Sequence, residues 1–183
     1  MVRRIFFSLA LIFVVCCSFG QKVFINKSSE VSFYSVAPLE NIEAHNSSMS
    51  SMLNTATGEI AFSVPIRNFR FKKELMQEHF NEKYLESDRF PQSTFQGRFE
   101  EVVDYKQNGT YPVNVHGKLT IHGITKEVSE PGKIVIAGTE IQAETEFAVA
   151  VGEYGIRIPQ LLFENIADTV TVKIHVTYQP YEK

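Results

Sequence analysis

The sequence predicts a mainly β protein in which about eight antiparallel strands surround one interior, with one α-helix inserted. The prediction depends on strict apolar–polar alternation over residues 111–123, further alternating runs on both sides of it, and one stretch of helical period over residues 72–85. Such a set of elements fits a closed barrel or a two-sheet sandwich. Closure is favoured because it removes exposed strand edges, which are sites of aggregation.

The stretch from Tyr111 to Gly123 predicts one long strand with an apolar and a polar face, because side chains on a strand alternate between faces. The apolar face carries Tyr111, Val113, Val115, Gly117, Leu119, Ile121 and Gly123. The polar face carries Asn114, His116, Lys118, Thr120 and His122. The thirteen residues, at about 3.3 Å each, span roughly 43 Å. The glycines on the apolar face predict unfilled space beside it.

The remaining strands are predicted from the same alternation. They are expected at residues 22–26, 30–37, 58–66, 133–137, 139–151 and 169–178, together with a strand whose inner face carries Phe95, Gly97, Phe99 and Val103. The polar, serine-rich stretch 41–54 is predicted to be a strand end and a loop. Asn108-Gly109 predicts a hairpin turn, and Glu130-Pro131-Gly132 predicts a second turn.

One helix is predicted over residues 72–85. Its apolar residues recur at helical spacing: Phe71, Leu75, Met76, His79 and Phe80. Pro91 limits regular hydrogen bonding beyond the helix, so the chain is expected to return to strands there. No internal repeat or low-complexity linker interrupts residues 21–183, which are therefore predicted to form one domain.

The first twenty residues are expected to be a secretory signal peptide. Arg3 and Arg4 precede the apolar run Ile5 to Val15, and Ser18 and Gly20 are small residues at the positions that precede a cleavage site. The run is shorter than the roughly 20 residues of a bilayer-spanning helix. A lipid anchor on Cys16 or Cys17 is the alternative to simple cleavage.

Cleavage at this point would remove both cysteines and leave 16 basic against 21 acidic side chains, a net charge of −5. The absence of any basic cluster argues against nucleic acid or an anionic membrane surface as a direct partner. We expect an exported protein, in the periplasm or outside the cell, without a membrane span and without thiol chemistry.

Catalytic and metal-binding patterns are not apparent. His116 and His122 share a strand face but lie about 20 Å apart, too far to bind one ion together. His79 has no second histidine or cysteine one helical turn away, and the sequence contains no Gly-x-Ser-x-Gly motif. We therefore predict that the protein is not an enzyme and uses no metal or cofactor.

The interior can be interpreted in two ways. Its many phenylalanines could simply pack a solid core, as aromatic residues usually do. Small residues on the expected inner faces favour a ligand cavity instead: Ser35, Ala37, Gly97, Gly117, Gly123, Ala143 and Thr145. An eight-stranded barrel is just wide enough either to be filled by side chains or to hold one small ligand.

Particular segments resemble the YceI-like family. These are His116 to Val128 (HGKLTIHGITKEV), Glu74 to Gly97 (ELMQEHFNEKYLESDRFPQSTFQG) and the opening residues 23–33. The resemblance covers nearly all of residues 21–183. It implies an exported bacterial protein with a lipocalin-like barrel, some relatives of which hold a polyisoprenoid or isoprenoid quinone. Many members carry an Arg-Asp pair before the helix, whereas this chain has Arg70-Phe71-Lys72-Lys73, so the resemblance does not identify the ligand.

We therefore predict a barrel that sequesters an elongated hydrophobic molecule, an isoprenoid or another lipid, with the helix closing one end and a homodimer as a further possibility. The expected cavity lining is Phe33, Phe62, Phe69, Phe71, Leu75, Met76, Phe80, Phe95, Phe99, Gly117, Leu119, Ile121, Ala143 and Phe147. Tyr34, Tyr154 and Arg157 are expected at a polar mouth. The alternative function is a structural or interaction module of the cell envelope with a filled barrel.

Overall fold

A computed structural model describes residues 23–36, 41–158 and 167–182. The expected signal peptide and its cysteines therefore lie outside the described residues. The elements in order are β1 (Val23–Ser35), β2 (Ile42–Asn46), β3 (Ser50–Asn54), β4 (Glu59–Pro65), η1 (Ile66–Asn68), β5 (Arg70–Phe71), α1 (Glu74–His79), η2 (Phe80–Tyr84), β6 (Gln92–Arg98), β7 (Gly109–Ile121), β8 (Ile124–Ala137), β9 (Glu140–Ala150), η3 (Val151–Tyr154) and β10 (Thr169–Pro180).

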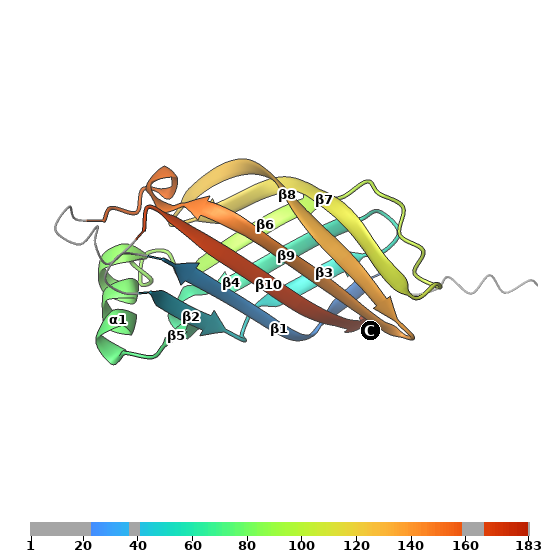
Figure 1. Cartoon of the computed structure of the whole chain (residues 1–183), viewed down its shortest axis with the longest axis horizontal. Helices are drawn as coiled ribbons and strands as arrows, with labels where there is room; N and C mark the ends of the chain where they lie inside the picture. The colour runs from blue at the N-terminus through green and yellow to red at the C-terminus, as the bar shows by residue number, and fades with distance from the viewer. Residues whose placement is uncertain (1–22, 37–40, 159–166, 183) are drawn as a thin grey trace, which may run out of the picture.

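The strands form a closed antiparallel barrel, as the sequence predicts (Figure 1). The ring runs β1-β10-β9-β8-β7-β6-β4-β3 and back to β1, and the β1–β10 pairing closes it. Every pairing in the ring is antiparallel. β2 continues along β1 beyond β3 and also pairs with the short β5, so this part extends the barrel wall beside α1.

The N-terminal segments differ from the prediction of two short strands. β1 is one strand of 13 residues, with a bulge between Asn26 and Ser28. The bulge shifts the register by one residue, so alternation read along the sequence breaks there although the strand continues.

The prediction of a strand end and a loop over residues 41–54 assigned too little strand, because β2 and β3 occupy most of this stretch. Their buried polar residues are hydrogen-bonded within the barrel. Asn46 Nδ2 donates to the carbonyl oxygen of Pro65 (2.8 Å), and the Ser51 and Tyr178 hydroxyls are 2.6 Å apart. Buried polar groups with partners carry little penalty, which is why a serine-rich sequence can form a barrel wall.

The expected turns were also misplaced. The β7–β8 hairpin turns at His122 and Gly123, which both have positive φ, so β7 ends at Ile121 rather than continuing to residue 123. Asn108-Gly109 is not a hairpin turn, since Gly109 already pairs with Ile136 in β8. The tight turn between β7 and β8 needs glycine-compatible backbone angles, which His122 and Gly123 adopt.

Glu130-Pro131-Gly132 lies inside β8 and was wrongly predicted as a turn. Proline lacks an N–H group and is tolerated only where no ladder partner requires one. At Pro131 the β8–β9 ladder has just ended, because its last pair is Gly132 with Thr145. Towards residue 124, β8 therefore pairs with β7 alone.

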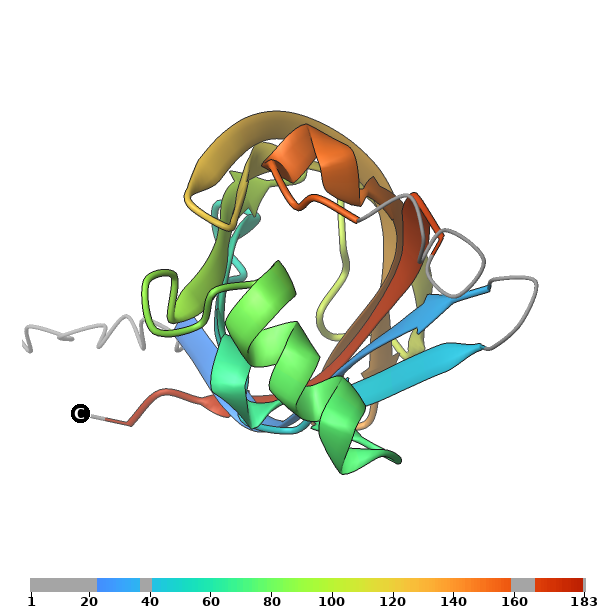
Figure 2. The same cartoon turned by 90° about the vertical axis from the view of Figure 1, so that its left-hand side faces the viewer.

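The predicted helix is shorter in the structure: α1 covers residues 74–79 and continues into the π-helical turn η2. Figure 2 looks into this end of the barrel, where α1 crosses the lower part of the opening and η3 lies above it. We call this the helix end, and the opposite end, where β1 begins and β10 finishes, the plugged end.

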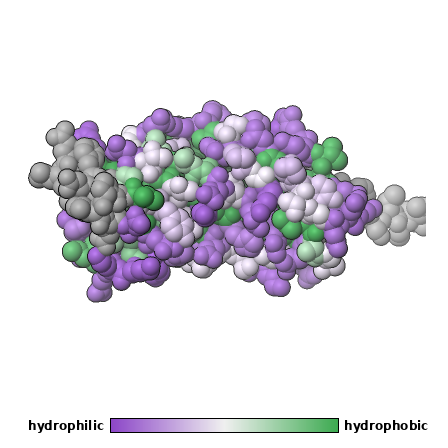
Figure 3. All heavy atoms as spheres, viewed as in Figure 1, coloured by the Kyte–Doolittle hydropathy of each residue, from purple (hydrophilic) through white to green (hydrophobic). Residues whose placement is uncertain are grey.

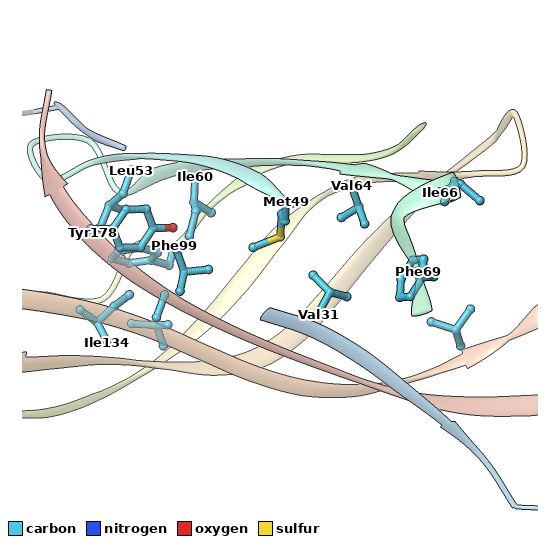
Figure 4. Packing of buried hydrophobic residues seen from close by; sticks show 14 of the residues in the cluster. Val31, Met49, Leu53, Ile60, Val64, Ile66, Phe69, Phe99, Ile134 and Tyr178 are labelled. Atoms are coloured by element: carbon cyan, nitrogen blue, oxygen red, sulfur yellow. The ribbon is translucent and has the colours of Figure 1, made fainter. Parts of the chain in front are cut away.

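The plugged end is packed with buried side chains. Figure 4 shows Leu53, Ile60, Phe99, Ile134 and Tyr178 pointing towards one another between the strands. Each is at most 4% exposed. Phe99 and Val103 were expected in a strand, but they follow β6 in the connection to β7, and Phe99 fills the interior from there.

Candidate functional site

A cavity of about 300 Å³ lies under α1 at the helix end. Its volume is at the lower limit of pockets that bind small molecules. Eight of the predicted residues line it: Phe33, Phe69, Phe71, Met76, Phe80, Leu119, Ile121 and Phe147. They come from β1, the η1–β5 segment, α1, η2, β7 and β9, so the barrel brings together residues that are far apart in the sequence.

Four phenylalanines form the part of the lining nearest α1. The ring centre of Phe33 is 5.5 Å from that of Phe69, 5.8 Å from that of Phe71 and 5.5 Å from that of Phe80. These distances are those of favourable aromatic contacts. Phe80 comes from η2, so the helical segment is anchored to the wall by aromatic packing.

A smaller cavity of about 90 Å³ lies further along the barrel axis. Phe62, Phe95, Phe99 and Ala143, all predicted as lining, contribute to its wall. Both cavities share a wall formed by Val64, Ser93, Leu119, Phe147 and Ile174. The two spaces are therefore neighbours in one apolar interior.

Gly117 was predicted to leave space, but the structure fills that space. Gly117 pairs with Gly97 across β6 and β7, and the Phe95 ring lies against both. A Cβ at Gly117 would be 2.3 Å from the carbonyl oxygen of Gln96 and 2.8 Å from Phe95 Cζ. The glycines permit close packing of an aromatic ring, and Gly117 lines neither cavity.

Four other predicted residues line neither cavity. Leu75 is 61% exposed on the outer side of α1. Tyr34 points outward beside Glu43, and hydrogen bonding to this carboxylate is the main reason its pKa is raised. Tyr154 is buried within η3, and Arg157 is exposed.

Several lining residues were not nominated from the sequence. They include Ile42, Ile66, Leu85, Val151, Val170, Val172 and Ile174. Alternation along β10 already places Val170, Val172 and Ile174 on the inner face, so that signal was present. Ile42 could not be found because its stretch was predicted to be a strand end and a loop.

His122, in the β7–β8 turn, contacts two other segments at the rim of the helix end. Its Nδ1 donates to the carbonyl oxygen of Tyr154 (3.1 Å), and its Nε2 lies 3.1 Å from Glu86 Oε1. The Phe90 ring packs on the imidazole with 4.5 Å between ring centres. Thus the β7–β8 turn holds both η3 and the segment that follows η2.

The face of the molecule shown in Figure 3 is mainly hydrophilic, and its apolar residues form small separate spots. No cluster of three or more potential metal ligands occurs within residues 23–36, 41–158 and 167–182. In these same ranges no helix has the length and apolar character needed to cross a bilayer.

The family model of the YceI-like domain matches residues 24–178. The chain belongs to the YceI-like family. No curated protein sequence matches it significantly.

Solved structures of other proteins share the fold at low sequence identity. A polyisoprenoid binding domain from Saccharophagus degradans implicated in plant cell wall breakdown superposes with a TM-score of 0.75 at 14% identity, covering 86% of this chain and 98% of that domain. Burkholderia cenocepacia BcnA gives 0.70 at 18% identity, covering 81% and 95%. The Campylobacter jejuni YceI protein gives 0.63 at 13% identity, covering 79% and 88%.

Proposed function

We propose that this YceI-like protein is an exported binding protein that holds an elongated hydrophobic molecule, an isoprenoid or another lipid, inside its barrel. The observation that carries the proposal is the apolar cavity of about 300 Å³ under α1. The neighbour described as a polyisoprenoid binding domain supports the ligand class. The N-terminal pattern of residues 1–20 supports export.

Affinity in this proposal comes from removing hydrocarbon from water. Each buried methylene contributes about 0.8 kcal/mol. Affinity should therefore increase with the length of the hydrocarbon chain until the larger and the smaller cavity are both occupied. Met76 provides an adaptable contact at the helix, since its thioether side chain fits irregular shapes.

The alternative, an envelope module with a filled barrel, requires an interior without space. The cavity at the helix end argues against it, and the separate apolar spots on the face in Figure 3 offer no large docking patch there.

The test is identification of the molecule that co-purifies from the native host. The protein is purified without detergent, and native mass spectrometry is followed by organic extraction and lipid analysis. We expect a hydrophobic molecule in near-stoichiometric amount. An empty protein that also fails to bind added isoprenoids would contradict the proposal. N-terminal sequencing of the exported form tests cleavage after Gly20.

A further inference from the structure

An acidic side chain lies on the inner face of the barrel wall. In β8, Ile134 is 1% exposed on the inner face, and alternation places Gly132 and Glu130 on the same face. Glu130 pairs with Val115 in β7, and both line the smaller cavity. A carboxylate in an otherwise apolar interior is costly unless it has a partner.

Among the described residues Glu130 has no such partner, although its charge contributes to the raised pKa of Tyr154. Within the described part of the chain, no ion pair or hydrogen bond involves its carboxylate. Burial raises the pKa of Glu130. The side chain is partly exposed, which is consistent with a position at the edge of the cavity.

The wall opens beside this residue. The β8–β9 ladder ends at the pair Gly132–Thr145, where Thr145 Oγ1 donates to the carbonyl oxygen of Pro131 (2.7 Å). The smaller cavity reaches this point, and an outer groove shares five of its lining residues: Gly132, Lys133, Glu144, Thr145 and Ile174. Only a thin layer of side chains therefore separates the cavity from the outer surface here.

The charges around the two cavities do not balance. Among the described lining residues, the Asp, Glu, Lys and Arg side chains are Glu130, Lys133 and Glu144. Lys133 Nζ is 2.8 Å from Glu144 Oε2, so these two neutralise each other. In the larger cavity, His79 Nε2 accepts a hydrogen bond from Lys83 Nζ (2.9 Å). One negative charge remains, at Glu130.

We propose that Glu130 holds the polar end of the bound molecule and selects a head group that donates a hydrogen bond, an alcohol or an amine, over an anionic phosphate. The hydrocarbon tail then lies in the larger cavity under α1. Glu130 pairs with Val115 of β7, and Leu119 in the shared wall lies four residues further along that strand. The distance along the strand is roughly 13 Å. This inference rests on the proposed function, since it assigns the orientation of the same ligand.

A different role for Glu130 must be distinguished by experiment. Inward-pointing charges on unpaired strand edges also prevent edge-to-edge association, and β8 has such an edge from residue 124 to 131. That role predicts an effect of Glu130 on oligomeric state and none on the choice of head group.

The test uses geranylgeraniol, geranylgeranylamine and geranylgeranyl monophosphate as probes with the same tail. Each displaces a fluorescent apolar dye from delipidated protein. We expect the alcohol and the amine to bind the wild type at least about tenfold more tightly than the monophosphate, because hydrogen bonds to a charged group are strong. In Glu130→Gln this ratio should fall to about threefold or less.

Glu127→Gln is the matched control. Glu127 lies on the outer face of the same strand, exposed and 3.8 Å from Lys118 Nζ, so its removal should leave the ratio unchanged. Equal binding of all three probes by the wild type would overturn the inference while the proposed function stands. If Glu130→Gln keeps the wild-type ratio of affinities and forms larger oligomers on size-exclusion chromatography, the role of Glu130 is instead to prevent association through the unpaired edge of β8. Absence of binding by all three would overturn the proposed function, and the inference with it.

Discussion

The two ends of the barrel use the same strands and the same residue types but reach different packing. On β10, Val176 is 0% exposed at the plugged end, whereas Val170 and Val172 remain partly exposed at the helix end, where they line the cavity. On β9, Ile141 is buried at the plugged end and Phe147 is half-buried towards the helix end, although Val149 beyond it is buried again.

The difference comes from what enters the barrel at each end. At the plugged end Phe99, from the connection after β6, fills the interior, and the hydrogen-bonded pair of Ser51 and Tyr178 closes it. At the helix end α1 and η2 lie across the opening without filling it. An apolar wall alone therefore does not produce a cavity; the connecting segments decide whether the interior is solid or hollow.

The largest expected effect is on stability: a Leu→Ala substitution should lower the free energy of unfolding more at the plugged end than at the wall of the cavities. Leu53→Ala at the plugged end should lower the free energy of unfolding by about 2–5 kcal/mol, because Leu53 is fully buried. Leu119→Ala at the shared cavity wall should cost only about 1 kcal/mol, because its side chain already borders empty space. Urea denaturation of both variants measures this, and equal losses would contradict the comparison.

A smaller change should affect binding rather than stability. Val172 lies between Phe33 and Phe147 on the neighbouring strands, so Val172→Phe should fill part of the larger cavity. We expect at least about tenfold weaker binding of geranylgeraniol, with stability changed by less than about 1 kcal/mol. Thr171→Phe, one position away on the outer face, is the control and should bind normally. Normal binding by Val172→Phe would mean that the ligand lies elsewhere.

The smallest effect concerns the plugged end at high pH. The Tyr105 hydroxyl is buried and, among the described residues, has no hydrogen-bond partner; burial raises its pKa to about 12. Because an unfolded tyrosine ionises near pH 10, folding favours the neutral form. Stability from this group is fully present below about pH 10 and is lost as the pH rises towards about 12.

Tyr105→Phe should therefore be as stable as the wild type at neutral pH and lose less stability between about pH 9 and 11. The loss should be reduced rather than abolished, since burial also raises the pKa of Tyr178. Urea midpoints at the two pH values measure the effect. A marked destabilisation of the variant at neutral pH would show that the hydroxyl has a stabilising role.

Much of the candidate site could be predicted because strand alternation is a local property. The inner faces of β7, β9 and β10 follow from every second residue, and they supplied Leu119, Ile121 and Phe147 to the cavity wall. Buried polar residues in β2 and β3 and the bulge in β1 concealed the same pattern elsewhere. Leu75 was misassigned because a short helix with a π-helical continuation does not keep one face over its whole length.

The sequence alone determined the class of fold, the one inserted helix and the apolar side of the long strands, since these depend on residue periodicity. The tertiary structure decided which half of the interior is filled, that the Phe95 ring occupies the space beside Gly117, and that Glu130 faces inward where β8 leaves β9. The physical reason is that empty space and unpaired charge depend on which distant segments meet, and periodicity along the chain carries no information about those partners.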